Sequence, residues 1–144
     1  MPSDADANPN QESRVRIEGL AEVVLNVRDM DRALGFYRDL LGLTVISPPE
    51  RTNPVFLRAG AATETLPAMV VLVQLPAGAA EFATPRTLHH LALAVPAAAF
   101  DATRDALTAH GLAVRTGQHP VLPSRTMYVD DPDGNEVEFI APDR

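Results

Sequence analysis

Leu20-Ala-Glu-Val-Val-Leu-Asn-Val27 is matched, 68 positions later, by Leu88-His-His-Leu-Ala-Leu-Ala-Val95. Both stretches show the period-two alternation that is typical of a β-strand with one packed face. Each is followed by a helical pattern that ends in Gly-Leu, at Gly42-Leu43 and at Gly111-Leu112. The chain is therefore a tandem duplication of one small unit. We expect its function to lie where the two copies meet.

The first copy, about residues 18–77, is predicted to fold in the order β-α-β-β-β. A strand at 20–27 leads into a helix over 30–41, because apolar residues recur there at helical spacing. Asp29 or Asp31 can cap the start of this helix. The remaining three strands are expected at 43–46, 55–58 and 69–75, divided by turns rich in Pro, Gly and Thr.

The second copy, about residues 86–141, repeats this order. A strand at 88–95 precedes a helix that begins near Pro96 and ends at Gly111. Its last three strands are expected at 112–116, 125–130 and 135–141. Residues 1–14 are polar and without periodicity, so we expect a flexible tail ahead of a single domain over 15–144.

Composition limits the classes of function. A chain of 144 residues with 46% apolar content is long enough for one domain with an ordinary core. Without cysteine, any bound metal must use His, Glu, Asp or Gln. A formal charge of -7 disfavours nucleic acid as a partner. No apolar run approaches the roughly 20 residues of a membrane span and no signal pattern is present, so we expect a cytoplasmic protein.

Three motifs, in order, carry a resemblance to a known family. They are Arg28-Asp-Met-Asp-Arg-Ala-Leu-Gly-Phe-Tyr-Arg-Asp-Leu-Leu-Gly-Leu43, His89-His-Leu-Ala-Leu-Ala-Val95 and Tyr128-Val-Asp-Asp-Pro-Asp-Gly-Asn-Glu-Val-Glu-Phe139. Over about residues 18–141 the chain resembles the vicinal oxygen chelate superfamily of glyoxalase I, extradiol dioxygenases and bleomycin-resistance proteins. The resemblance implies an α+β fold, in which two tandem β-α-β-β-β modules form a curved eight-stranded mixed sheet around an open cleft. It does not specify the reaction.

The resemblance also implies a metal site on the first and last strand of each module. Carried over to this chain, its ligands are Glu22, Gln74, His90 and Glu138. An imidazole, two carboxylates and an amide oxygen suit a divalent ion such as Fe, Mn, Zn, Ni or Co, and Glu138 or Glu22 can then shuttle a proton. The alternatives are a core histidine at His90, solvated glutamates, and a hydrogen-bonded or solvated Gln74.

Strand parity supports these positions. The residues that share a strand face with the expected ligands are Val24 and Asn26 for Glu22, Ala92 and Ala94 for His90, and Val70 and Leu72 for Gln74. By the same rule, His89 points away from the cleft. His110 ends a helix, where a structural or solvated role is expected.

Substrate contacts are expected from the segment before and within the strand at 125–130. Relatives of the dioxygenase type place a catalytic or substrate-contacting His and Tyr in this region, which implies such roles for His119 and Tyr128. Arg125 can contact an anionic substrate. The alternatives are a loop histidine without a function and a surface arginine.

The function predicted from the sequence is a metal-dependent enzyme that acts on a small molecule with vicinal oxygens, as a lyase, isomerase or ring-cleaving dioxygenase. The alternative is a metal-free protein that sequesters a small ligand, as bleomycin-resistance relatives do. An aromatic content of 5%, without tryptophan, weakens this alternative, because flat ligands are usually held by stacking. A third possibility is an interaction module with a closed cavity. We expect a homodimer, because edge strands of an open sheet need covering.

Overall fold

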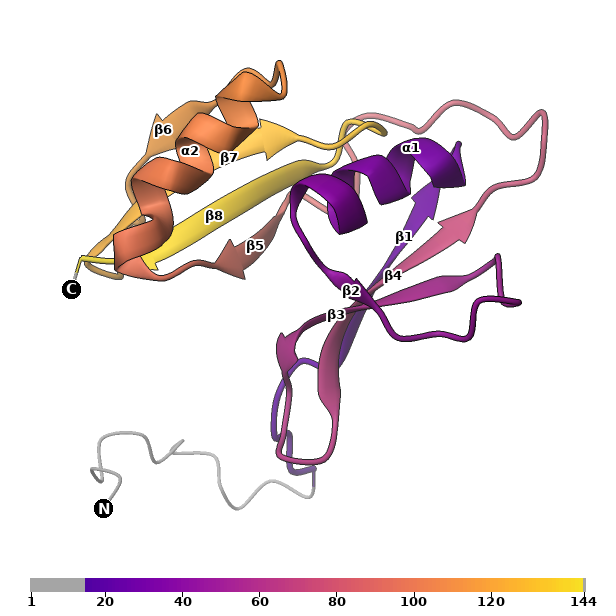
Figure 1. Cartoon of the computed structure of the whole chain (residues 1–144), viewed down its shortest axis with the longest axis horizontal. Helices are drawn as coiled ribbons and strands as arrows, with labels where there is room; N and C mark the ends of the chain where they lie inside the picture. Colours follow the sequence, from indigo (N-terminus) through magenta and orange to yellow (C-terminus); the bar gives the residue numbers. More distant parts are fainter. Residues whose placement is uncertain (1–14, 144) are drawn as a thin grey trace.

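The computed structural model describes residues 15–143 and contains the two expected β-α-β-β-β modules (Figure 1). The first module consists of β1 (Glu22–Val27), α1 (Met30–Leu34), the π-helical segment η2 (Gly35–Leu40), β2 (Thr44–Val45), β3 (Val55–Ala61) and β4 (Pro67–Gln74). The second consists of β5 (Leu91–Ala94), the 3-10 turn η3 (Ala97–Ala99), α2 (Phe100–Ala109), β6 (Arg115–Gly117), β7 (Ser124–Asp130) and β8 (Glu136–Pro142). The predicted α+β class is confirmed, whereas the expected tail, 1–14, lies outside the described residues.

Each module forms its own four-stranded mixed sheet. The strand orders are β1-β4-β3-β2 and β5-β8-β7-β6. In each sheet the first strand pairs in parallel with the last, and the other neighbours are antiparallel. The eight predicted strands are therefore present, but they are hydrogen-bonded as two sheets of four. In Figure 1, α2 lies across one face of the second sheet.

The helix predicted over 30–41 begins at Met30, directly after its N-cap residue. Asp29 Oδ1 accepts a 3.1 Å hydrogen bond from the backbone N–H of Arg32, so Asp29 is the capping residue. After one α-helical turn the backbone widens into η2, in which the N–H of Leu41 donates to the carbonyl of Phe36 at 2.9 Å. This bond spans one residue more than an α-helical bond, and the adjacent Phe36 and Tyr37 are both buried.

The core lies between each sheet and its helix. In the first module it includes Leu25 and Val27 on β1 and Val70 and Leu72 on β4, each at most 4% exposed. In the second module the core includes Met127 and Val129 on β7 and Val137 and Phe139 on β8. Buried side chains of both modules join into one cluster. Within residues 15–143, neither helix has the length and apolar character of a membrane span.

One buried hydrogen bond joins the first helix to the second module. The Tyr37 hydroxyl donates to Asp131 Oδ2 at 2.6 Å, and Asp131 lies in the turn between β7 and β8. Asp131 Oδ1 in turn accepts the backbone N–H of Asn135 at 2.8 Å. Burial, followed by the charge of Asp131 and this hydrogen bond, raises the pKa of Tyr37 far above its usual range. The contact thus fixes the joint between the modules.

The segment between β4 and β5 is held by both modules. Phe82 lies between two guanidinium groups, with Arg28 at 4.8 Å and Arg86 at 4.6 Å from its ring centroid. Arg28 donates to the carbonyl of Ala80 in this segment, and Arg86 donates to Asn135 Oδ1 at 2.9 Å. The connection that passes from one module to the other is therefore anchored at both ends.

Candidate functional site

Glu22 and His90 line the same cavity, of about 490 Å³, between the two modules. The strand pairings near the two residues also correspond. Val24 of β1 pairs with Val71 on β4, and Ala92 of β5 pairs with Glu138 on β8. Glu22 and His90 stand two residues before Val24 and Ala92, with the same offset of 68. The two side chains therefore occupy equivalent places in the two copies.

His90 and Glu138 form the chemical centre of the site. His90 Nε2 lies 3.1 Å from Glu138 Oε2. The Glu138 side chain is only 5% exposed, whereas that of His90 remains 34% exposed. The parallel pairing of β5 with β8 brings them close, because it places Glu138 beside Ala92, two residues after His90. A buried carboxylate is thus presented next to an accessible imidazole.

Tyr128 completes this centre from β7. It pairs with Glu138 across the antiparallel β7–β8 ladder, and its hydroxyl donates to Glu138 Oε1 at 3.1 Å. Its ring meets that of His90 edge to face, at a centroid distance of 5.9 Å. Burial raises the pKa of Tyr128, the Thr126 hydroxyl lowers it, and the bond to Glu138 raises it further. Tyr128 therefore stays protonated and able to donate at neutral pH.

His89 also belongs to this group, which strand parity did not predict. Its Nδ1 lies 2.7 Å from Nδ1 of His90, and the two rings meet at 73°. Both residues precede the first paired residue of β5, Leu91. Alternation of side chains holds within a paired strand, so it does not separate two residues that lie ahead of one. The doubled histidine was the only sequence feature that pointed to this contact.

Glu22 does not converge with the pair. No group of three or more His, Asp or Glu side chains within residues 15–143 is arranged to hold a metal ion. The expectation that Glu22 joins His90 and Glu138 as a ligand therefore stays a prediction, with Glu22 and His90 lining one cavity. Glu22 lies on the edge strand of a separate sheet, where no hydrogen-bonded ladder ties it to β5. It faces the cavity from the opposite module.

Gln74 lies on the other face of its sheet from Glu22, and its role as a ligand stays a prediction. Glu22 pairs with Met69, so the residues of β4 that share its face are Met69, Val71 and Val73. Gln74 points to the helix side, where its Oε1 accepts the backbone N–H of Met30 at 2.9 Å. Gln74 does share a face with Val70 and Leu72, as the alternation along β4 predicts. Whether that face turns toward the cavity depends on the register of β4 with β1. Gln74 instead satisfies an N–H at the start of α1.

The position in the first module that corresponds to Glu138 is held by Val71. Side by side across the first sheet lie Val24, Val71, Phe56 and Ile46, which we call the apolar row. The corresponding row of the second sheet is Ala92, Glu138, Tyr128 and Arg115. Only the second copy therefore carries a carboxylate and a phenol at these positions.

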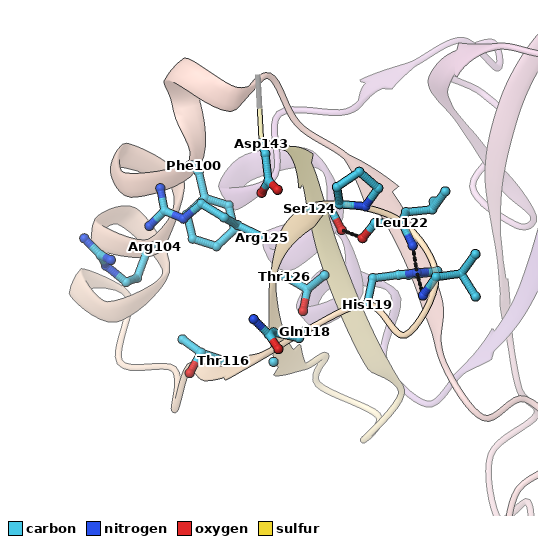
Figure 2. A pocket seen from close by; sticks show the side chains of 13 residues that line it. Phe100, Arg104, Thr116, Gln118, His119, Leu122, Ser124, Arg125, Thr126 and Asp143 are labelled. Atoms are coloured by element: carbon cyan, nitrogen blue, oxygen red, sulfur yellow. Dashed lines mark hydrogen bonds between the residues drawn. The ribbon is translucent and has the colours of Figure 1, made fainter.

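His119 and Arg125 lie in a different pocket, of about 620 Å³, at the loop between β6 and β7 (Figure 2). His119 Nδ1 accepts the backbone N–H groups of Val121 and Leu122, at 3.1 and 2.9 Å. Arg125 stacks over Phe100 and bonds to an α2 carboxylate. Figure 2 shows His119 and Arg125 on opposite sides of Thr126. The structure does not bring either residue to the cavity of Glu22 and His90, so the predicted contact of both with one substrate is not supported.

Comparison with known proteins agrees with this architecture. The family model described as Glyoxalase/Bleomycin resistance protein/Dioxygenase superfamily matches residues 19–139. A catechol-2,3-dioxygenase from Bacillus subtilis (strain 168) is 29% identical over 121 residues, which are 81% of this chain and 39% of that protein. The chain thus spans about two fifths of the length of this curated relative.

Two solved structures share the fold over most of their length. One is a lactoylglutathione lyase from Agrobacterium tumefaciens, with 25% identity, a TM-score of 0.59, and coverage of 85% of this chain and 92% of that chain. The other is a mutant of the fosfomycin resistance protein FosX from Listeria monocytogenes, complexed with Mn(II) and 1S,2S-dihydroxypropylphosphonic acid. It is 18% identical, with a TM-score of 0.66 over 88% of this chain and 92% of that chain. With its family model matched over nearly the whole described chain, this protein belongs to the glyoxalase/bleomycin resistance protein/dioxygenase superfamily.

Proposed function

We propose that this chain is a metal-dependent enzyme that acts on a small molecule with two neighbouring oxygens, in a reaction of the glyoxalase or extradiol dioxygenase type. The observation that carries the proposal is the 3.1 Å contact between His90 Nε2 and Glu138 Oε2, in which His90 also lines the cavity between the modules. The family of the chain and its similarity to a catechol-2,3-dioxygenase support it.

The donor atoms of this pair fit a divalent ion. Two ligands at about 2.1 Å from one ion, at right angles to each other, lie about 3 Å apart. The His90–Glu138 distance matches this spacing, and the bond from Tyr128 occupies only the other carboxylate oxygen. A nitrogen and a carboxylate oxygen suit Fe, Mn, Zn, Ni or Co. Glu22 would supply a third donor from the opposite wall of the cavity.

The side chains around the pair define what the chain itself contributes. A divalent ion held here supplies Lewis-acid chemistry, which favours the negative charge that develops on a bound vicinal oxygen. Glu138 is one of the two ligands, and its buried carboxylate can also hold a proton taken from substrate. Tyr128 keeps that carboxylate oriented through its hydroxyl. Glu22 is exposed to the cavity and offers a second proton acceptor.

The cavity wall favours a neutral substrate. Apart from Glu22 and His90, the residues that line it are Leu20, Ala21, Val23, Ala59, Ala68, Met69, Val70, Leu88, Leu91, Ala92 and Leu93. None of them carries a positive charge that would pair with a phosphonate or carboxylate. An apolar wall also excludes water from the reacting oxygens. We therefore infer a substrate whose body is apolar and whose polar atoms are confined to the two oxygens.

The first experiment is metal analysis of protein purified without chelator. About one divalent ion per chain is expected, and His90→Ala and Glu138→Ala should both lose it. His110→Ala provides a matched control, because this exposed imidazole lies at the end of α2. The metal-loaded protein is then assayed with catechols for ring cleavage and with hemithioacetals for isomerisation. Full metal content in both site variants would contradict the proposal.

A metal-free ligand-binding protein is the second candidate. The observation that favours it is that only two donors converge within the described residues, with Glu22 apart from them. Such a protein would bind an apolar ligand in the cavity with equal affinity before and after treatment with a chelator. Metal analysis and calorimetry with and without chelator therefore separate the two candidates.

A further inference from the structure

A short arm ahead of β1, residues 15–20, lies outside both sheets. Its sequence, Val-Arg-Ile-Glu-Gly-Leu, begins with the alternation of apolar and charged residues that is typical of a strand. All six residues are exposed, with Ile17 at 79% and Leu20 at 71%. A strand-like sequence with exposed apolar side chains is thus presented to solvent.

The start of β4 keeps the arm out of its own sheet. The N–H of Met69 donates to the carbonyl of Ala21 at 2.8 Å. The next N–H along this side of β4 would come from Pro67, two residues earlier, which has none. Gly19 then passes close to the hairpin of β3 and β4, because a Cβ there would lie 2.9 Å from the carbonyl oxygen of Ala62. The arm therefore runs beside the tip of this hairpin, as Figure 1 shows.

The charges of the arm are complementary to those of a second copy of the same arm. In an antiparallel pair related by a two-fold axis at Ile17, the two Ile17 side chains face each other. Arg16 of each copy then faces Glu18 of the other, and opposite charges in such positions attract. A parallel pair in register would instead set Arg16 beside Arg16 and Glu18 beside Glu18. The charges therefore select the antiparallel arrangement.

We propose that the arm is a dimerisation element, in which residues 15–19 of two copies of this chain pair as an antiparallel ribbon centred on Ile17. Pairing covers Ile17 and gives its backbone a ladder partner that its own sheet does not provide, since β1 begins at Glu22. A ribbon of this length is marginal by itself, so its signature is a specific register and not a high affinity. The inference is independent of the proposed function, because it involves neither His90 nor Glu138.

The test uses single cysteines, because the natural chain has none and an introduced thiol reports what lies opposite it. In the ribbon the two Cα atoms of residue 17 lie about 4.5 to 5.5 Å apart, which is within disulfide range. Leu20→Cys is the matched control, since Leu20 is almost equally exposed but lies about 20 Å from its own copy in this register.

The equilibrium constant for forming the disulfide-linked dimer is measured for each full-length variant in a glutathione redox buffer. The constant for Ile17→Cys should exceed that for Leu20→Cys by at least about 10-fold. Equal constants, or no linked dimer of Ile17→Cys, would overturn the inference.

Charge reversal tests the register in the Ile17→Cys background. Glu18→Arg sets two arginines opposite each other at both charged pairs and should lower the constant about 10-fold. Adding Arg16→Glu exchanges the two charges and should restore it. Glu50→Arg makes the same change in net charge at an exposed position outside the arm and should have little effect. A constant that Glu18→Arg leaves unchanged, or that the double reversal fails to restore, would contradict the proposed register.

Discussion

His90 Nε2 lies 3.1 Å from Glu138 Oε2, and the parallel pairing of β5 with β8 sets Glu138 beside Ala92, two residues after His90. This contact joins an accessible base to a buried carboxylate. Substitutions at this contact can separate its effect on stability from its effect on metal binding and turnover.

Replacement of His90 by Ala should release metal and leave the fold intact. The imidazole is partly exposed and lies outside the buried core, so its loss creates no cavity. Glu138 keeps its bond from Tyr128, and we expect the free energy of unfolding to fall by no more than about 1–2 kcal/mol. Elemental analysis and thermal denaturation measure the two effects, and metal retained at the wild-type level would refute the role of His90.

Tyr128→Phe removes the hydroxyl that donates to Glu138 Oε1 while keeping the ring. A hydrogen bond to a charged group contributes about 1.5–3 kcal/mol, so this variant should be less stable by about that amount. We expect it to retain metal but to lose turnover, because the carboxylate is no longer held in one orientation. Urea denaturation and the separate effects on kcat and KM test this; an unchanged kcat would argue against an orienting role.

Tyr37→Phe should change how stability responds to alkaline pH. The pKa of Tyr37 is raised in the folded chain, so above pH about 10 only the unfolded state releases this proton. Stability is then fully present below pH 10 and falls by up to about 1.4 kcal/mol per pH unit above it. The Phe variant should be less stable at pH 7 but should lose less stability between pH 10 and 11.5. Parallel slopes for both proteins in urea denaturation over this range would contradict the assignment.

Gln74→Ala tests the helix-capping role of this residue. Loss of the acceptor for the Met30 N–H should lower stability by about 0.5–2 kcal/mol without changing metal content. Gln74→Glu keeps an acceptor oxygen and adds a negative charge at a helix start, so it should be as stable as the wild type. If Gln74→Ala lost metal while keeping its stability, the residue would act as a ligand.

The apolar row predicts self-association. Val24 is 51% and Ile46 38% exposed, on the face of the first sheet that no helix covers. A homodimer would bury them, so light scattering at micromolar concentration should give about twice the chain mass of 15.5 kDa. Val24→Asp should shift the protein toward monomer, whereas Val121→Asp, at an 81% exposed loop position, should not. A wild-type mass of one chain would reject the prediction.

The sequence predicted the fold well because periodicity depends on local chemistry. The duplication, the cap at Asp29 and the order of the strands all follow from neighbouring residues. The site was predicted in part. His90, Glu138 and Tyr128 come together as their motifs implied, because all three belong to the second module, whose strands pair with one another.

The sequence predicted less where the outcome depends on how strands or modules are placed against each other. Gln74 was assigned to the wrong face because the register of β4 against β1 is not encoded in β4 alone. Glu22 was expected beside His90, but its position depends on the packing of two separate sheets. His119 lies in a loop whose path is set by its own backbone contacts, which no periodic pattern describes.

The π-helical segment η2 makes the joint between the modules sensitive to chain length. Tyr37 reaches Asp131 from a segment whose hydrogen bonds close one residue later than in an α-helix, and each residue rotates an α-helix by about 100°. Deletion of a single residue from Gly35–Leu40 would let the segment relax into a regular α-helix and turn the phenol away from its carboxylate partner. The contact between the two modules then depends on the number of residues in this segment, so that an insertion or deletion can alter it while every cavity-lining side chain stays the same.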